Sequence, residues 1–264
     1  MTESLDFYLN QLRLSKDAGN VDSLLLKLSN DNDGKMDPRT AVCEVLAEIF
    51  KTRWAKKTAT WLTTAGFPKL LAGKTFNTKQ GNLPIDQAES FLECDWIERH
   101  ENMLISGPAG IGKTHFSVAI GKRAIAKGYR TKFSSATNLF KILSKAEETS
   151  PVLFEKKFQH LLAQDLLIID DMGNGAYPPK AGEYLYMLMD MRSQRALSTI
   201  ITTNSSIKDW SEKLGNPHNL RAGLDRFLEQ AHWIKFQGKS LRLVSFYKRN
   251  KIKGGQSLEE MSNA

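Results

Sequence analysis

One segment determines how this chain folds: Gly107-Pro108-Ala109-Gly110-Ile111-Gly112-Lys113-Thr114. It matches the pattern G-x-x-x-x-G-K-[ST] without a gap, and it stands between an apolar run and a helical pattern. The glycines let the backbone curl so that successive N–H groups point at phosphate oxygens, and the helix that follows adds its positive N-terminal end. The segment, extended to His115, therefore predicts a nucleotide-phosphate site on a loop between a strand and a helix.

Two side chains at the end of this loop predict how a nucleotide and its cation are held. Lys113 would place a positive charge on the β- and γ-phosphates, and the Thr114 hydroxyl would ligate the Mg²⁺ that bridges them. The alternative is a chance match to the pattern, and the strand–loop–helix setting argues against it. ATP and Mg²⁺ are therefore the cofactors that we expect.

Short apolar runs alternate with helical segments after residue 84. The runs lie at 103–106, 131–134, 166–170, 199–203 and 232–236, and the helices between them lie at about 113–127, 137–145, 151–164, 180–195, 207–214 and 219–229. Such alternation is typical of α/β proteins, in which helices cover both faces of a parallel sheet. We therefore expect a five-stranded parallel sheet in a domain over residues 85–249, which begins with a helix over 85–100.

The sequence before residue 85 predicts a small all-helical domain. An amphipathic helix is expected over residues 4–28, and a second helix begins at Asp37-Pro38 and ends near Ala65. We assign residues 1–66 to a helical domain that binds a partner or DNA, residues 67–84 to a linker and residues 250–264 to a flexible tail.

A second motif consists of two acids at the end of an apolar run. Asp170 and Asp171 follow Leu166-Leu167-Ile168-Ile169. Carboxylates at the carboxyl end of a parallel strand face the same crevice as the phosphate loop. Asp170 is therefore placed to hold Mg²⁺, usually through water, and Asp171 is placed to orient or deprotonate an attacking water. The alternative is that the two acids merely begin a loop.

Three polar residues further along the chain carry less information. Asn204 ends the run 199–203 and could donate to the γ-phosphate or hold the attacking water, although Asn after a strand is also common in turns. Arg226 could be an arginine finger that stabilises charge on the transferred phosphoryl group, or it could belong to a structural Asp–Arg pair. Arg242 could be a second arginine that senses the phosphate.

The charge balance fits a nucleic-acid partner. The chain has 37 Lys and Arg against 29 Asp and Glu, a net charge of +8 and a pI near 9.3. Residues 120–145 and 235–253 each contain seven basic residues and no acid, and residues 39–74 contain seven basic residues and two acids. These blocks are either solvated faces or a positive surface for phosphates, and their clustering favours DNA binding.

The sequence also indicates a compartment. Cys43 and Cys94 lack metal-binding spacing, which favours two reduced cysteines over a zinc site. The first residues contain acids and no apolar core of a signal peptide, and no apolar run reaches the roughly 18 residues of a membrane span. We therefore expect a cytoplasmic protein without a membrane partner.

Together the motifs resemble one known family. The segments NMLISGPAGIGKTHFSVAIGKRAIAKGYR, DLLIIDDMG, STIITTN and GNPHNLRAGLDRFLEQAHWIKFQGKSLR are similar to those of the IstB/DnaC-like AAA+ ATPases, over about residues 95–245. The helical region before them, followed by FPKLLAGKTFN, also looks like IstB, the helper ATPase of a class of bacterial insertion sequences. The resemblance implies an AAA+ P-loop core of the initiator and helicase-loader type.

The resemblance also implies roles for individual residues and a set of partners. The matching positions are residues 107–114 for Walker A, Asp170 and Asp171 for Walker B, Asn204 for sensor 1, Arg226 for the arginine finger and, less closely, Arg242 for sensor 2. The family implies ATP-driven self-assembly on double-stranded DNA and delivery of target DNA to a transposase, IstA. An arginine finger generally completes the site of a neighbouring subunit, so ATP should drive oligomerisation.

One residue departs from the pattern of many AAA+ proteins, which carry Glu where this chain has Asp171. Because Asp is one methylene shorter, an attacking water would have to sit closer to the backbone. We therefore expect an ATPase whose Mg²⁺-dependent hydrolysis is slow and regulated by DNA or a partner.

Three other functions stay open. A DnaC-like loader shares the core and would have the replicative helicase as its partner, although the basic N-terminal helices without a cysteine zinc site favour IstB. A small-molecule phosphotransferase would need neither Asn204 nor Arg226. A non-catalytic DNA-binding module would not need the acids Asp170 and Asp171.

Overall fold

The computed structural model describes residues 23, 38–76, 84–215, 217–238 and 240–250. The chain divides into two compact units between Thr60 and Trp61, and each unit is described by itself. The helix predicted over 4–28 lies outside the described residues except for Ser23, and so does the predicted tail except for Asn250.

Helix α3 (Pro38–Thr64) is the second helix that the sequence predicts, and it contains the division between the units. On its first-unit part the Phe50 and Trp54 rings stack with centroids 5.6 Å apart, and Lys57 Nζ lies 5.4 Å from the Trp54 ring. One basic residue of this helix, Lys57, therefore lies beside an aromatic ring.

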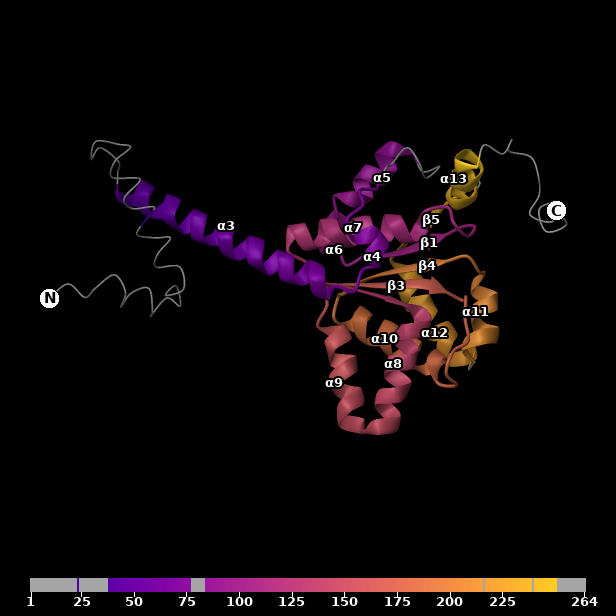
Figure 1. Cartoon of the computed structure of the whole chain (residues 1–264). Coiled ribbons are helices and arrows are strands. Elements are labelled where there is room, and N and C mark those ends of the chain that lie inside the picture. The colour runs from indigo at the N-terminus through magenta and orange to yellow at the C-terminus, as the bar shows by residue number, and fades with distance from the viewer. Residues whose placement is uncertain (1–22, 24–37, 77–83, 216, 239, 251–264) are drawn as a thin grey trace. The chain divides into compact units, whose positions relative to one another are not determined.

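The second unit is built on five parallel strands (Figure 1), which confirms the predicted sheet. The strands are β1 (Asn102–Ser106), β2 (Thr131–Ser135), β3 (Leu166–Met172), β4 (Ser198–Thr203) and β5 (Ala231–Lys235). Their order is β2-β3-β4-β1-β5, so β1 lies between β4 and β5 and carries the phosphate loop near the middle of the sheet.

Helices cover both faces of this sheet (Figure 1). One face carries α4 (Lys69–Ala72), α5 (Ile85–Leu92), α6 (Asp95–Glu98) and α7 (Lys113–Lys127). The other face carries α8 (Ala136–Thr149), α9 (Pro151–Leu162), α10 (Ala181–Gln194), α11 (Ile207–Leu214) and α12 (Pro217–Glu229). No helix within these described segments is long and apolar enough to cross a bilayer.

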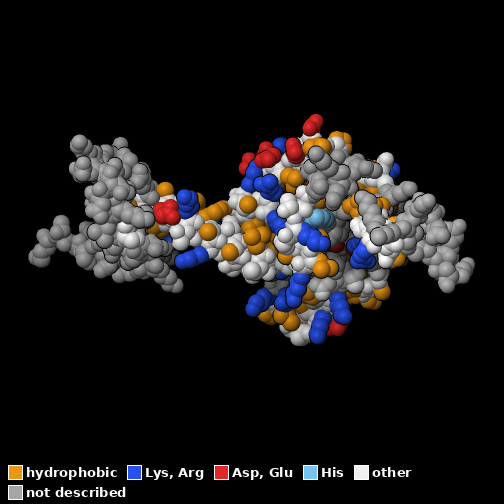
Figure 2. Space-filling model, turned by 45° about the horizontal axis from the view of Figure 1, so that its top comes forward, with side chains coloured by type: hydrophobic (Ala, Val, Ile, Leu, Met, Phe, Trp, Pro, Cys, Tyr) orange, Lys and Arg blue, Asp and Glu red, His pale blue; other side chains and the backbone are white. Residues whose placement is uncertain are grey.

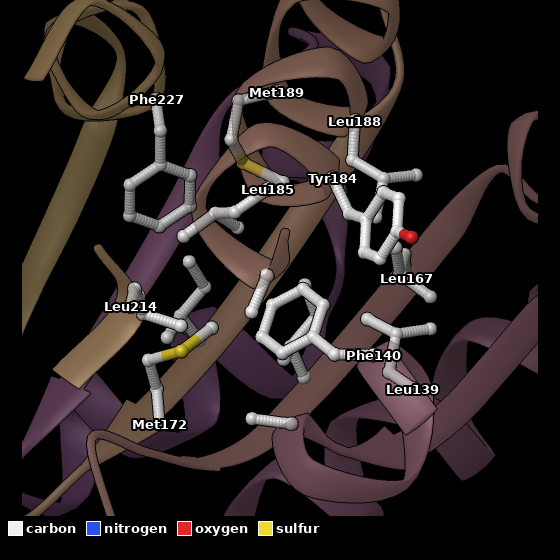
Figure 3. Packing of buried hydrophobic residues seen from close by; sticks show 14 of the residues in the cluster. Leu139, Phe140, Leu167, Met172, Tyr184, Leu185, Leu188, Met189, Leu214 and Phe227 are labelled. Carbon is white, nitrogen blue, oxygen red and sulfur yellow. The ribbon is translucent and has the colours of Figure 1, made fainter. Parts of the chain in front are cut away.

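Alternation along the strands explains the two cores. On β3, Leu166 and Ile168 pack into the core on the α7 face, and Leu167 and Ile169 pack into the core on the α8–α12 face. The second core is shown in Figure 3, where Phe140 and Leu139 of α8 lie near residues of α10, and Phe227 of α12 belongs to the same cluster. Strands β1, β3 and β4 are buried almost throughout, which is why they read as short apolar runs, whereas β2 and β5 contain polar and partly exposed residues.

Two helical predictions differ from the structure. The single helix predicted over 85–100 is wrong, because the chain breaks between α5 and α6 at Cys94, a buried residue with φ of 61°. Trp96, just after the break, is also buried and donates from Nε1 to the carbonyl O of Phe91 at 3.1 Å. The helix α13 (Leu241–Arg249) is not among the predicted helices.

The described part of the predicted linker packs against the second unit. Lys122 of α7 donates from Nζ to the carbonyl O of Leu71 at 2.7 Å and of Lys74 at 3.0 Å. A Cβ at Gly121 would lie 2.9 Å from the Phe67 ring, so α7 approaches this segment closely. Residues 67–76 therefore form part of the second unit's packing, and the domain boundaries at 66 and 84 stay a prediction.

Candidate functional site

The predicted phosphate loop connects β1 to α7 at the carboxyl end of β1 (Figure 1). Gly107 and Gly110 have φ values of 146° and 76°, in the region that favours glycine. A Cβ at Gly107 would lie 2.4 Å from the carbonyl O of Phe236, and a Cβ at Gly110 would lie 2.2 Å from Ser240 Oγ. The loop therefore needs glycine both for its backbone conformation and for the close approach of the segment after β5.

The Lys113 side chain is folded into this loop. Its Nζ donates to the carbonyl oxygens of Gly107 and Pro108, both at 2.7 Å. Lys113 is only 8% exposed, and burial lowers its pKa while the carboxylates of Asp171 and Asp170 act in the opposite direction. An ammonium group enclosed by loop backbone provides the charge that a nucleotide phosphate requires, so these residues fit such a ligand.

The Asp170 carboxylate, on β3, accepts hydrogen bonds from two hydroxyl groups, one of which belongs to Thr114 at the start of α7. Thr114 Oγ1 donates to Asp170 Oδ1 at 2.9 Å, and Thr202 Oγ1 of β4 donates to the same oxygen at 2.6 Å. Burial raises the pKa of Asp170, and the hydrogen bonds from Thr202 and Thr114 oppose that rise. The Thr114 hydroxyl and the Asp170 carboxylate are oxygen ligands of the kind that Mg²⁺ takes.

A cation at this position would need further oxygen ligands. Among the described residues no group of three or more His, Cys, Asp or Glu gathers in a way that could hold a metal. Mg²⁺ usually keeps several waters and binds through one or two carboxylates together with substrate phosphates. The pairing of Thr114 with Asp170 therefore fits a cation that binds together with a nucleotide.

Asp171 has an unusual backbone conformation. Its φ is 59°, and the register between β3 and β4 shifts between Ile169 and Met172. Its N–H donates to Thr202 Oγ1 at 3.0 Å, and its Oδ2 accepts from Asn174 Nδ2 at 3.0 Å. A positive φ is rare for a residue other than glycine, and such strain collects at functional sites.

Asn204 directly follows β4 and is exposed. Its Oδ1 accepts from Ser205 Oγ at 3.4 Å. The preceding residue, Thr203, accepts at its carbonyl O from the N–H of Gly107 at 3.2 Å. The chain at Asn204 therefore lies beside the start of the phosphate loop, and its role toward a phosphate stays a prediction.

Arg242 lies against the phosphate loop. The N–H of Leu241 donates to the carbonyl O of Gly110 at 3.0 Å, and Arg242 Cδ lies 3.8 Å from the Cβ position of Gly110. The charge of Arg242 also acts to lower the pKa of Lys113. Sequence spacing gave Arg242 the least support of the site residues, whereas the structure puts it near Lys113 because α13 begins at the loop.

Arg226 lies elsewhere, on α12. It forms an ion pair with Asp190 of α10, and 44% of its side chain is exposed. The structure thus contains an Asp–Arg pair, with a partner distant in sequence. No hydrogen bond or ion pair joins Arg226 to the phosphate loop among the described residues, and its role toward a nucleotide stays a prediction.

His115 turns toward the predicted linker. Its ring packs edge-on against Phe76 with centroids 5.3 Å apart, and its Nε2 is buried without a hydrogen-bond partner among the described residues. Burial lowers the pKa of His115, and the charges of Lys122 and Lys74 lower it further. This environment favours the neutral imidazole, and its contact with a nucleotide stays a prediction.

Comparisons with known proteins show which family this chain belongs to. The family described as IstB-like ATP binding protein matches residues 8–249. The chain belongs to the IstB-like ATP-binding family. One relative, an ATP-binding protein named after insertion sequence IS5376 of Geobacillus stearothermophilus, is 34% identical over 198 residues, which is 75% of this chain and 77% of that protein. Another, named after insertion sequence IS21 of Pseudomonas aeruginosa, is 27% identical over 240 residues, which is 90% of this chain and 88% of that protein.

A solved structure supports the fold of this IstB-like chain. AMPPCP-bound DnaA from Aquifex aeolicus superposes with a TM-score of 0.52 at 16% identity, covering 72% of this chain and 59% of that one. Identity this low establishes the AAA+ P-loop fold and nothing further. The family match and the fold together make this an ATP-binding AAA+ protein associated with insertion sequences.

Sequence reasoning missed several side chains that support the site of this IstB-like protein. Thr202 contacts both acids, Asn174 holds Asp171, and Ser240 lies against Gly110. Thr202 belongs to the run 199–203, where the appearance of hydroxyl residues at the strand's end was a usable signal. Nothing local marks Ser240, because its contact with the loop forms only in the folded chain.

The basic block at residues 120–145 separates into two groups. Four members are bound to backbone carbonyls or to carboxylates within the unit: Lys122, Lys127, Arg130 and Lys132. In the part of the chain that the structure covers, the side chains of Arg123, Lys141 and Lys145 make no hydrogen bond or ion pair. Figure 2 shows several Lys and Arg side chains together on the lower part of the visible face, with few Asp or Glu among them.

Proposed function

We propose that this protein is an Mg²⁺-dependent ATPase that assembles on duplex DNA and assists an insertion-sequence transposase. The observation that carries the proposal is the grouping of Lys113, Thr114, Asp170 and Asp171 at one edge of the sheet. The relatives named after insertion sequences support the biological setting. A cytoplasmic location is part of the proposal.

The residues around the loop would divide the work of holding Mg²⁺ and ATP. When bound, ATP would supply a transferable phosphoryl group, and Mg²⁺ would offset the negative charge of that group. Lys113, now bonded to the carbonyls of Gly107 and Pro108, would turn its ammonium to phosphate oxygens. Thr114 and Asp170 would hold the cation, and Arg242 would add positive charge from the open side of the loop.

Hydrolysis would use Asp171 as the residue that orients and deprotonates a water molecule. Asn174 fixes one of its carboxylate oxygens, which leaves the other oxygen to accept a proton. Asn204, after the neighbouring strand, would help to hold the same water. The strained backbone at Asp171 would keep the short side chain pointing toward the loop.

Arg226 would complete the site of a neighbouring subunit, since no hydrogen bond or ion pair joins it to its own loop among the described residues. Mixed assemblies can test this idea. An Arg226→Ala subunit keeps its loop and acids, and an Asp171→Asn subunit keeps its arginine, so each variant alone should be nearly inactive. Mixing the two should restore phosphate release on duplex DNA, and a mixture that stays inactive would refute action between subunits.

DNA would bind through basic side chains that form no ion pair within the described segments. On α8 these are Lys141 and Lys145, which line one hollow, and on α9 Lys156 and Lys157 are also exposed. Contacts to phosphates give binding without sequence preference, because the backbone is the same at every base pair. Lys122 and Lys127 are less suitable, since each is already bound within the unit.

Salt dependence tests this surface. Binding of the wild-type chain to duplex DNA should weaken steeply with salt, and Lys141→Gln with Lys145→Gln should lower the log–log slope by about 2. The control is Lys127→Gln, which removes a charge already paired with Glu93 and Asp95 and should leave the slope unchanged. Salt-insensitive binding by the wild type would refute the DNA proposal.

The insertion-sequence names of the similar proteins support a transposase, rather than a replicative helicase, as the proposed partner. A pull-down with the full chain, in ATP and on duplex DNA, would compare the transposase of the same insertion sequence with the replicative helicase. Retention of the helicase and not of the transposase would favour the loader function instead.

A further inference from the structure

Helices α10 and α12 approach each other closely at one point. A Cβ at Gly223 of α12 would lie 2.9 Å from the Tyr186 Cα of α10, so the backbones meet there without an intervening side chain. Around this point α12 buries Leu224 and Phe227, and Figure 3 shows Phe227 in the same core as Leu185 of α10. The position and rotation of α12 on α10 are therefore fixed by packing.

One helical turn beyond the contact between Gly223 and Tyr186, the two helices bring Arg226 and Asp190 together. Arg226 follows Gly223 by three residues and Asp190 follows Tyr186 by four, so both side chains emerge on the same side of the crossing. Arg226 Nη1 donates to Asp190 Oδ1, and the guanidinium carbon lies 6.0 Å from the centre of the Tyr186 ring. Hydrogen bonding to Tyr186 and the charge of Asp190 both raise the pKa of Arg226.

The contacts with Asp190 and Tyr186 leave part of the Arg226 side chain exposed to solvent. Arg226 has 44% of its side chain exposed, whereas only 20% of the Asp190 side chain is exposed behind it. A guanidinium carries five N–H donors in a planar fork, more than one carboxylate oxygen can accept. The remaining donors can therefore meet a second acceptor while Asp190 stays bound.

A long exposed arginine would otherwise sample many rotamers, and a group that must meet a developing charge loses effectiveness when it is misplaced. We propose that Asp190, assisted by Tyr186, is a positioning residue that holds Arg226 ready for the nucleotide of a second copy of this chain. This inference rests on the proposed function, in which Arg226 acts between subunits. Asp190 acts only through Arg226 and contacts no part of the loop.

The first test compares Asp190→Asn with the wild type in full-length protein on saturating duplex DNA. Asn keeps the shape and removes the charge, so kcat should fall roughly tenfold while KM for ATP changes less than about twofold. The matched control is Asp225→Asn, the same change at an exposed position beside Arg226 on α12, which should leave kcat unchanged. Thermal unfolding of each variant shows whether the fold is retained. Tyr186→Phe is a milder change beside the same arginine.

A double variant separates positioning from a general structural role. Because Asp190 acts through Arg226, Arg226→Ala with Asp190→Asn should be as slow as Arg226→Ala alone. An additional loss in the double variant would overturn the inference, and so would wild-type kcat in Asp190→Asn when Arg226→Ala is impaired. Normal activity of Arg226→Ala itself would instead refute the proposed role of the arginine.

Discussion

Thr202 offers a test of how the two acids are held, because one hydroxyl group serves both. Its Oγ1 donates to Asp170 Oδ1 at 2.6 Å and accepts from the N–H of Asp171 at 3.0 Å, and the residue is 1% exposed. Thr202→Val keeps the shape of the side chain and its place in β4. It removes the donor to a buried carboxylate and the acceptor of a strained backbone N–H.

The size of the effect follows from these two losses. A hydrogen bond to a charged group contributes about 1.5–3 kcal/mol, and leaving the partly buried N–H of Asp171 without an acceptor adds about 1 kcal/mol, the low end for an unsatisfied group. Since one hydroxyl makes both bonds and the structure can relax, we expect a loss of about 3 kcal/mol in the free energy of unfolding. For a domain of this size that corresponds to a decrease in Tm of roughly 6–12 °C.

Thr131→Val provides the comparison. Thr131 is also buried, on β2, but its hydroxyl makes one bond, to the carbonyl O of Tyr129 at 3.2 Å. Its replacement should cost about 1 kcal/mol. Urea denaturation and thermal unfolding of both variants without nucleotide measure the difference. If Thr202→Val is no more destabilising than Thr131→Val, the hydroxyl does not hold the two acids in the way described.

Three further predictions concern the same site. Burial raises the pKa of Asp170, so ionising this carboxyl group in the folded chain costs stability. Asp170→Asn should therefore unfold at a higher temperature than the wild type at neutral pH, and this difference should disappear as the pH falls below the unperturbed Asp pKa of about 3.9. The same variant should lose Mg²⁺-dependent nucleotide binding. Asp171→Glu should release phosphate faster, and an unchanged turnover would contradict the idea that the short acid slows hydrolysis. Gly110→Ala should weaken ATP binding about tenfold in a titration with a fluorescent nucleotide, because its φ of 76° is strained for any residue with a Cβ and that Cβ would also crowd Ser240. Gly73→Ala has an ordinary φ of −92° and meets no atom within 4 Å, so it should bind ATP normally.

The elements that the sequence predicted well have causes that are local in the chain. The loop at 107–114 is recognisable because glycines, lysine and hydroxyl each answer a requirement of phosphate binding within eight residues. Strands β1, β3 and β4 are recognisable because burial on both faces produces short apolar runs, and the alternation with helices then indicates β2 and β5. Asp170 and Asp171 could be placed near the loop because parallel strands end at the same edge of the sheet.

The features that the sequence did not predict depend on contacts between distant segments. The break at Cys94 has no glycine or proline to mark it, and it is supported by the burial of Trp96 after it. Asp190 lies 36 residues before Arg226, and only the close packing at Gly223 brings the two together. Arg242 was undervalued for the same reason, since its place beside Gly110 depends on the path of the chain after β5.

The two arginines of the proposed site are separated by one rigid strand. Arg226 belongs to α12, which ends directly before β5, and Arg242 belongs to α13, which begins soon after it. Strand β5 pairs with β1 along its whole length, from Asn102 to Ser106. On the proposed function, Arg242 meets the nucleotide of its own subunit while Arg226 meets that of the next. A nucleotide bound at one loop would therefore contact Arg242 of its own subunit and Arg226 of its neighbour. The bound nucleotide would then link neighbouring DNA-bound subunits as well as serve as the substrate for hydrolysis.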